Sequence, residues 1–565
     1  MKIFLAVKTL TKLERSIAAG ALTVFLTASF FWAGNYFYGS TEEVPATSAS
    51  YSEGVIGQPV AINPVIASNN DADNDLIEIL FSGLLDLASH YSASKDGTTW
   101  NVFLKDGLKW SDGKPLTSDD VVFTMETIQN FEARSPLFLA WQGVKAERIS
   151  ELEIEFSMRT PYAFFLDNLK GLKIIPKHIF GPIPAANMRL SAYNLEPVGS
   201  GPYAFAGYNK RKDGFITDYT LKTNGYYALE KPYIDTFYVR FFPGTAEIIK
   251  AFNTRKIDGF GDLNPQNLDD ISASHQIVEL NIPRYYAIFL NQNGHPALKD
   301  KAVRQALGFA TDRNKIIETV FGNKAITADQ PILPFIPGYA TTTEPAEFSI
   351  EKAAGLLEKN GWKMNAATGI REKANTKGTD ILTFDIIVPE IQFLTETADL
   401  IKATWAKAGI GLTPIVLNPS DISQEVIKMR NYQMILFGNI LKKNPDAYSF
   451  WHSSERFYPG LNLSLYDSKK VDSLLEAVKV TMDEEGRNRH LAALQATIKD
   501  DVPAVFLFSP SYLYVTSPKF GGLDENVIAS ASDRFEHVRS WHLRTKRVFK
   551  KAGIVAEKHT KEHNE

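Results

Sequence analysis

Apolar residues in this chain recur with two different periods, which together predict a mixed α/β protein. A period of two, as at residues 151–158, predicts a half-buried strand. A period near 3.6 predicts helices, as at residues 299–321 and 394–408. Between residues 382 and 437 the patterns alternate as strand, helix, strand, strand, and that order is typical of an α/β lobe.

The stretch at residues 102–128 has the most distinctive pattern. It reads VFLKDGLKWSDGKPLTSDDVVFTMETI and predicts a strand, a turn, a second short strand, a turn and a helix. Thr117 or Ser118 would cap the helix, and Asp119 and Asp120 would lie in its first turn, where the helix dipole favours negative charge. Further on, residues 504–508 and 512–516 predict two more strands.

The N-terminus carries the longest uncharged apolar run, at residues 17–38. It is long enough to cross a bilayer as a helix, and its basic flank predicts a cytoplasmic stub at residues 1–16. Residues 39–50 then predict a flexible linker. The alternative is a signal peptide cut between Ala46 and Ser50, although bulky aromatics occupy the usual place of the cleavage site. In both cases the remaining chain lies outside the cytoplasm.

Size and composition limit the classes of protein. A chain of 565 residues predicts two or three compact units. A formal net charge of −4 gives no reason to expect nucleic acid as a partner. Cysteine is absent, which excludes disulfides, thiol nucleophiles, Cys-ligated metals and a lipid-modified N-terminal Cys.

The motifs of catalysis are absent as well. The ten His residues are scattered, apart from His559 and His563 in the polar tail, which we interpret as incidental. No Gly-x-Ser-x-Gly elbow and no Gly-rich phosphate loop occur. We therefore expect no catalysis, no cofactor and no metal.

Several blocks, in order along the chain, resemble one family. Besides residues 102–128, they are PVGSGPYAF at 197–205, the block at 231–259, LKDKAVRQALGFATDRNKII at 298–317 and FSIEKAAGLLEKNGW at 348–362. These blocks resemble the family-5 extracytoplasmic solute-binding proteins of ABC importers, which include oligopeptide-, dipeptide- and nickel-binding members. The similarity covers roughly residues 51–520.

The resemblance implies a periplasmic-binding-protein-like, two-lobed α/β fold of type II with an extra α/β domain, preceded here by one transmembrane helix. The expected division follows. Lobe I takes residues 51–84, 196–290 and 510–545, the extra domain 85–195, lobe II 291–509, and a flexible tail 546–565. The implied function is capture of peptides in a cleft between the lobes and delivery to the permease subunits of an importer whose ATPase is a separate chain. A monomer is expected.

The loop at residues 438–454 is the most informative about the ligand. In peptide-binding members an acid four positions before the Pro of a Pro-Asp step holds the peptide's α-ammonium, and here that position is Leu441. Asp446 is the nearest substitute, although a turn-capping role is equally open. Lys442 or Lys443 could face an anionic group, or both could be solvated.

Peptides add to such proteins as a strand. The expected ligand contacts therefore combine this loop with main-chain groups of the first predicted strand, at residues 52–56, and of residues 438–439. Burial in a lobe core is an open alternative for each aromatic residue among them. The candidates are Tyr51, Gly54, Trp141, Tyr286, Gly438, Asn439, Leu441, Asp446, Tyr448 and Trp451.

Two alternatives remain open at this point. The first is a binding protein for another solute, such as an oligosaccharide, a nickel chelate or a signalling peptide. The second is an extracytoplasmic hydrolase or chaperone built on the same scaffold.

Overall fold

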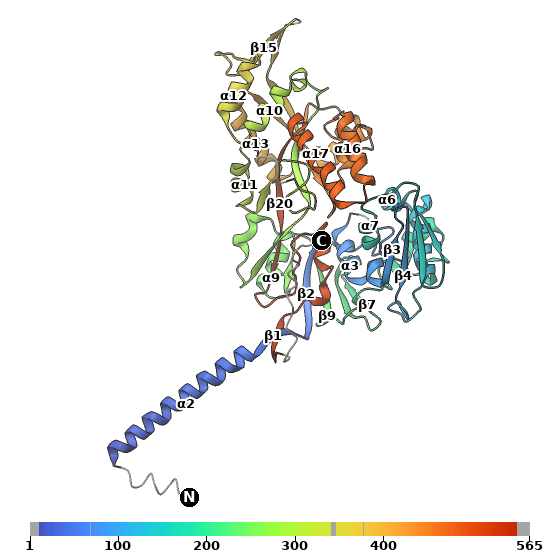
Figure 1. The fold of residues 1–565 in the computed structure, drawn as a ribbon, viewed down its shortest axis with the longest axis vertical. Coiled ribbons are helices and arrows are strands. Elements are labelled where there is room, and N and C mark those ends of the chain that lie inside the picture. Colours follow the sequence, from blue (N-terminus) through green and yellow to red (C-terminus); the bar gives the residue numbers. More distant parts are fainter. Residues whose placement is uncertain (1–10, 68, 341–345, 377, 551–565) are drawn as a thin grey trace, which may run out of the picture.

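The computed structural model describes residues 11–67, 69–340, 346–376 and 378–550. The body is elongated, with one lobe at each end and a smaller domain at its side (Figure 1). The long helix α2 (Lys12–Ser40) points away from this body. The two-lobed α/β architecture expected from the sequence is confirmed.

One sheet of twelve strands runs through both lobes, in the order β18-β17-β19-β12-β20-β10-β2-β9-β8-β7, with β11 and β13 also pairing with β20. Strand β20 (Ala504–Thr516) joins the lobes: its first half pairs with β12, and its second half pairs with β10 and β11. The sequence predicted two strands here. The two predicted segments form one continuous strand. Pro510 lies where the partner of β20 changes from β13 to β11, and β20 continues through it.

Lobe I is built on strands from distant parts of the chain. Its elements are β2 (Ser48–Ile56), α3 (Asp71–Leu80), β7 (Tyr203–Lys210), β8 (Ile216–Thr223), β9 (Ile234–Phe242), α9 (Thr245–Asn253), β10 (Gly259–Phe260) and β11 (Gln276–Asn281). The extra domain continues the same hydrophobic core, so the two pack as one body. Helix α3 begins after its cap, Asn70, and ends before Phe81.

The extra domain contains a four-stranded sheet in the order β3-β4-β6-β5. Its elements are α4 (Leu84–Leu87), β3 (Ala88–Ala93), β4 (Thr99–Leu104), α5 (Ser118–Gln129), α6 (Phe138–Trp141), β5 (Lys145–Arg148), β6 (Glu153–Ser157), α7 (Phe165–Gly171) and α8 (Lys177–Phe180). Thr117 caps α5 in a capping box with Asp120, as the sequence indicated. The predicted second short strand is only an isolated bridge between Lys109 and Pro115.

Lobe II surrounds the other end of the large sheet with helices. Its elements are β12 (Arg284–Leu290), α10 (Lys301–Phe309), α11 (Arg313–Phe321), β13 (Ala325–Thr327), α12 (Ile350–Lys359), β14 (Lys363–Met364), β15 (Arg371–Asn375), β16 (Gly378–Ile381), β17 (Thr383–Pro389), α13 (Gln392–Lys407), β18 (Gly411–Leu417), α14 (Pro419–Asp421), β19 (Met434–Ile440), α15 (Tyr448–Trp451), α16 (Lys469–Val480) and α17 (Glu484–Asp501). Strand β12, which comes just before the predicted boundary at residue 290, pairs with β19 and packs in the same core as the helices of lobe II.

The N-terminal helix is long and apolar enough to cross a membrane, and none of its most apolar window is buried in the body. It leads directly into β1 (Thr41–Ala46), which pairs antiparallel with β21 (Arg544–Phe549). The flexible linker predicted at residues 39–50 is therefore wrong, because the backbone of this segment pairs with a strand from the far end of the chain. Of the predicted tail 546–565, Lys546–Phe549 belongs to β21, and residues 551–565, like residues 1–10 of the stub, lie outside the described residues.

Candidate ligand site at the junction of the lobes

The loop after β19 reaches the C-terminal part of lobe I. The Lys443 ammonium lies 2.6 Å from a carboxylate oxygen of Glu536 and 3.4 Å from one of Asp533. The sequence left open whether this lysine is solvated or faces an anionic group. It faces carboxylates of its own chain, and their charges raise its pKa against the opposing effect of burial.

Glu536 also binds the extra domain, because the ammonium of Lys170 lies 2.7 Å from its second oxygen. Burial alone would raise the pKa of Glu536. The hydrogen bonds and charges of Lys170 and Lys443 outweigh it and lower the pKa to about 2. One carboxylate thus joins lobe I, lobe II and the extra domain.

Two side-chain contacts and one main-chain contact join the same region of lobe II to the extra domain. The Tyr162 hydroxyl donates to Asp446 at 2.7 Å, and the Asn444 amide donates to Asp167 at 3.0 Å. The Ala163 N–H donates to the Lys479 carbonyl at 2.7 Å. The loop predicted to report on the ligand is therefore the place where all three units meet.

Strand β19 presents a free edge at this junction. It pairs with β12 along its whole length, but with β17 only at Met434 and Ile435. Among the described residues, no strand pairs with that second edge beyond Ile435. The Leu441 N–H donates toward the β12 side, to Pro283, so by alternation the N–H and C=O groups of Gly438 and Ile440 face the free edge. This edge can accept one more strand.

Gly438 is required by its cross-strand neighbour. Tyr286 lies directly opposite in the β12–β19 register, and a Cβ on Gly438 would lie 2.8 Å from its ring. The ring thus crosses over the glycine beside the free edge. Tyr286 is only partly buried, and the guanidinium of Arg284 lies 5.7 Å from its centroid.

The neighbouring predicted residues serve the core of lobe II. The Asn439 amide donates to the Tyr285 hydroxyl at 2.9 Å, and the Trp451 indole donates to the same hydroxyl at 3.2 Å. The side chain of Leu441 is buried in this core too. The structure therefore places the Leu441 side chain inside lobe II.

Three other predicted contacts are buried in lobe I and the extra domain. Tyr51 is fully buried, with its hydroxyl 2.6 Å from that of Tyr514. Trp141 packs on Phe165 in the core of the extra domain. Gly54 lies between β9 and β10, so its main-chain groups already have strand partners. For Tyr51 and Trp141 this burial is the alternative that the sequence left open, because large aromatic residues commonly fill cores.

Asp446 caps a turn, since its carboxylate accepts the Tyr448 N–H at 3.0 Å. This is the capping role that the sequence left open beside amine binding. Tyr448 lies partly exposed next to it, with the Lys479 ammonium 4.0 Å from its ring centroid. The ligand roles of Asp446 and Tyr448 stay predictions.

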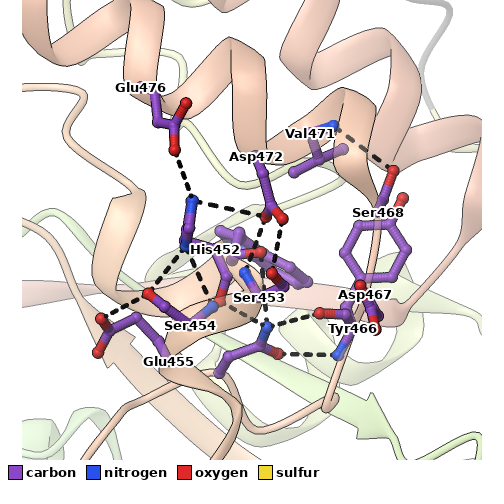
Figure 2. Close-up of polar contacts among 12 residues, drawn as sticks. His452, Ser453, Ser454, Glu455, Tyr466, Asp467, Ser468, Val471, Asp472 and Glu476 are labelled. Carbon is purple, nitrogen blue, oxygen red and sulfur yellow. Dashed lines mark hydrogen bonds and ion pairs between the residues drawn. The ribbon is translucent and has the colours of Figure 1, made fainter.

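A polar cluster around His452 and Asp472 lies on this side of the junction (Figure 2). The His452 ring stacks on Tyr448 at 4.2 Å, and its Nδ1 accepts the Ser454 N–H at 3.1 Å as a helix cap. Ser453 binds Asp472 through both its N–H and its hydroxyl. The Ser453 hydroxyl donates to the Asp472 carboxylate at 2.6 Å, and the Ser454 hydroxyl lies 2.8 Å from the Nδ1 of His452. These contacts hold the segment after α15 against α16.

Sequence reasoning missed a buried ionic network in lobe I. The guanidinium of Arg534 lies 3.0 Å from Glu53 and 2.6 Å from Asp75, and all three side chains are almost fully buried. Burial raises the pKa of Glu53 to about 7, against the lowering effect of Arg534 and Tyr514. No local motif announces such a network, because its members lie far apart in the sequence.

Comparison with known proteins identifies the class. The model of the bacterial extracellular solute-binding proteins, family 5, matches residues 85–457, so the chain belongs to this family. It is 27% identical over 481 residues to the oligopeptide-binding protein AppA of Bacillus subtilis, covering 81% of this chain and 86% of AppA.

Two solved structures have the same architecture. The ABC transporter substrate-binding protein CtaP of Listeria monocytogenes is 26% identical with a TM-score of 0.75, covering 88% of this chain and 99% of CtaP. The structure of AppA from Bacillus subtilis in complex with a nonapeptide is 24% identical with a TM-score of 0.67, covering 89% and 100%. The resemblance drawn from the motifs is confirmed.

Proposed function

We propose that this protein captures peptides as an added strand on the free edge of β19 and delivers them to the permease subunits of an ABC importer. The observation that carries the proposal is this edge, where Gly438 and Ile440 present main-chain groups at the junction of the three units. Hydrogen bonds to main chain hold a peptide independently of its sequence. The peptide ligand named for AppA supports the same class here.

The contacts across the junction provide the means of closure. Lys443–Glu536 and Tyr162–Asp446 join surfaces that must separate for a ligand to enter. A bound peptide would stabilise the closed arrangement by adding contacts to both sides, and the permease would recognise that form. The ATPase is expected on a separate chain, the binding protein is a monomer, and it catalyses nothing itself.

The ligand does not depend on a carboxylate at Leu441. That side chain is buried and apolar, and the lysine two residues later is paired with Glu536 and Asp533. We therefore propose peptides whose α-amine contributes little to binding.

The N-terminal helix is proposed to remain as an anchor on the extracytoplasmic face of the membrane. In support of this, β1 follows the helix without a linker and pairs with β21 over six residues. A cut between Ala46 and Ser50 would remove one strand of that pair.

Identification of co-purified ligand tests the proposal. The full chain is extracted in mild detergent, denatured, and the released small molecules are analysed by mass spectrometry. We expect peptides of mixed sequence. A single non-peptide metabolite, stoichiometric with the protein, would overturn the peptide assignment and favour another solute.

A further inference from the structure

The C-terminal strand caps the membrane helix. The last turn of α2 contains no basic residue of its own, so its terminal carbonyls need donors from elsewhere. The guanidinium of Arg547 donates to the carbonyls of Tyr38 and Thr41 at 3.3 Å, and the Lys550 ammonium donates to that of Gly39 at 3.0 Å. Two cations from the far end of the chain therefore complete this helix.

Aromatic contacts reinforce the cap. The Arg547 guanidinium lies 4.5 Å from the ring centroid of Tyr38, and Phe549 packs edge-on against Phe37 at 6.0 Å. Arg547 and Phe549 on β21 thus contact the end of the helix. Because side chains alternate along a strand, Arg544 and Lys546 lie on the opposite face, and both are exposed.

Helix length fixes the height of this ribbon above a bilayer. The apolar residues 17–38 span about 33 Å at 1.5 Å per residue, close to the thickness of a hydrocarbon core of about 30 Å. Only two residues, Gly39 and Ser40, separate Tyr38 from the start of β1. Lys546 lies opposite Val44, roughly 10 Å beyond the helix end at about 3.3 Å per residue. This places the cations in, or within about one Debye length of, the headgroup layer.

We propose that the β1–β21 ribbon is a lipid-binding surface, in which Arg544 and Lys546 contact the headgroups of anionic phospholipids. The inference rests on the proposed retention of the anchor. Arg547 and Lys550 hold the ribbon to the helix, and the two exposed cations add electrostatic attraction to an anionic surface. The contact would hold lobe I close to the membrane, with lobe II at the far end of the body (Figure 1).

The absence of native cysteine allows a direct test on the full chain. A nitroxide is attached at Thr545→Cys, and the protein is reconstituted into vesicles of phosphatidylcholine with or without phosphatidylglycerol. Collision rates with oxygen and with a water-soluble nickel chelate report its depth. A second label at Glu132→Cys, exposed on the extra domain, gives the aqueous reference.

With phosphatidylglycerol, the oxygen-to-nickel ratio at position 545 is expected to exceed the reference about threefold, and to fall toward it at about 0.5 M salt, where charges are screened within about 4 Å. The Arg544→Gln, Lys546→Gln variant should lose the effect. The same charge change at Lys359 and Lys363, exposed in lobe II, should not.

Flotation with the vesicles separates two ways of failing. A chain that does not float overturns the anchor and this inference together. A chain that floats with an aqueous label at 545, or with equal ratios in both lipid compositions, overturns the headgroup contact alone.

Discussion

The ammonium of Lys443 lies 2.6 Å from a carboxylate oxygen of Glu536, and this pair joins the loop after β19 to the C-terminal part of lobe I. Both side chains are mostly buried, at 34% and 19% exposure, so water screens the pair less than it would at an open surface. Lys170 completes the arrangement from the extra domain. If the lobes close on a ligand as proposed, these few charges would stabilise the closed form.

Lys443→Met is expected to shift the lobes toward the open form. Loss of a charge-assisted hydrogen bond that remains partly exposed should cost about 1 kcal/mol of closure, a change of about fivefold in the closed-to-open ratio. Single-molecule FRET between cysteines introduced in the two lobes measures this ratio. The matched control is Lys301→Met, which breaks a 2.6 Å pair with Asp500 inside lobe II and should leave the ratio unchanged. Equal effects of the two substitutions would contradict the assignment.

Closure should also depend on pH in a defined direction. Lys170 and Lys443 together lower the pKa of Glu536 to about 2, and Lys170 stays beside Glu536 when the lobes open. The part due to Lys443 makes this pKa lower in the closed form than in the open form, so the pair favours closure at neutral pH, and that contribution is lost as pH falls toward 2. The raised pKa of Lys443 keeps that side chain charged at neutral pH. The same FRET ratio should therefore be flat around neutrality and decline in acid, and Glu536→Gln should remove that decline. A decline centred near pH 7 would assign the effect to another group.

Gly438→Ala should impair ligand binding. The added Cβ would lie 2.8 Å from the Tyr286 ring, and overpacking of this kind typically costs about 1–3 kcal/mol. Peptide affinity measured by calorimetry is expected to fall at least tenfold. Gly308→Ala is the control, since nothing lies within 4 Å of its Cβ in α10 and the change favours a helix. Unaltered affinity in Gly438→Ala would show that the ligand does not use this edge.

Tyr51→Phe tests whether Tyr51 stabilises the core of lobe I or binds the ligand. The Tyr51 hydroxyl is buried against Tyr514 and Glu53, so its removal should lower the free energy of unfolding by about 1–2 kcal/mol. Thermal unfolding should report this loss while peptide affinity stays the same. Loss of affinity without loss of stability would restore Tyr51 to the ligand site.

Acetylation of the peptide α-amine should have little effect. A charge-assisted pair with a protein carboxylate would be worth about 1.5–3 kcal/mol, or roughly 10- to 150-fold in affinity. With Leu441 buried at the corresponding position, we expect the acetylated and free peptides to differ by less than about threefold. A large loss on acetylation would mean that another acid, such as Asp446, binds the amine.

Helix positions and helix caps could be predicted from the sequence, because they depend on residues close together in the chain. The helical pattern at residues 394–408 corresponds to α13, and Thr117 caps α5. Ordered motifs resembling the family predicted the lobes. Segment 39–50 could not be predicted, because its structure depends on β21, some 500 residues away along the chain. For the same reason the sequence left Lys443 undecided: its partners Asp533 and Glu536 are distant in the chain and adjacent only in the fold.

The free edge of β19 can be tested most directly by hydrogen–deuterium exchange of the full chain, with fragmentation that resolves single amides. If a peptide adds as a strand, the N–H groups of Gly438 and Ile440 should become protected at saturating peptide, while those of Asn439 and Leu441, which face β12, change little. Peptide binding detected by calorimetry without new protection at these two amides would contradict the account.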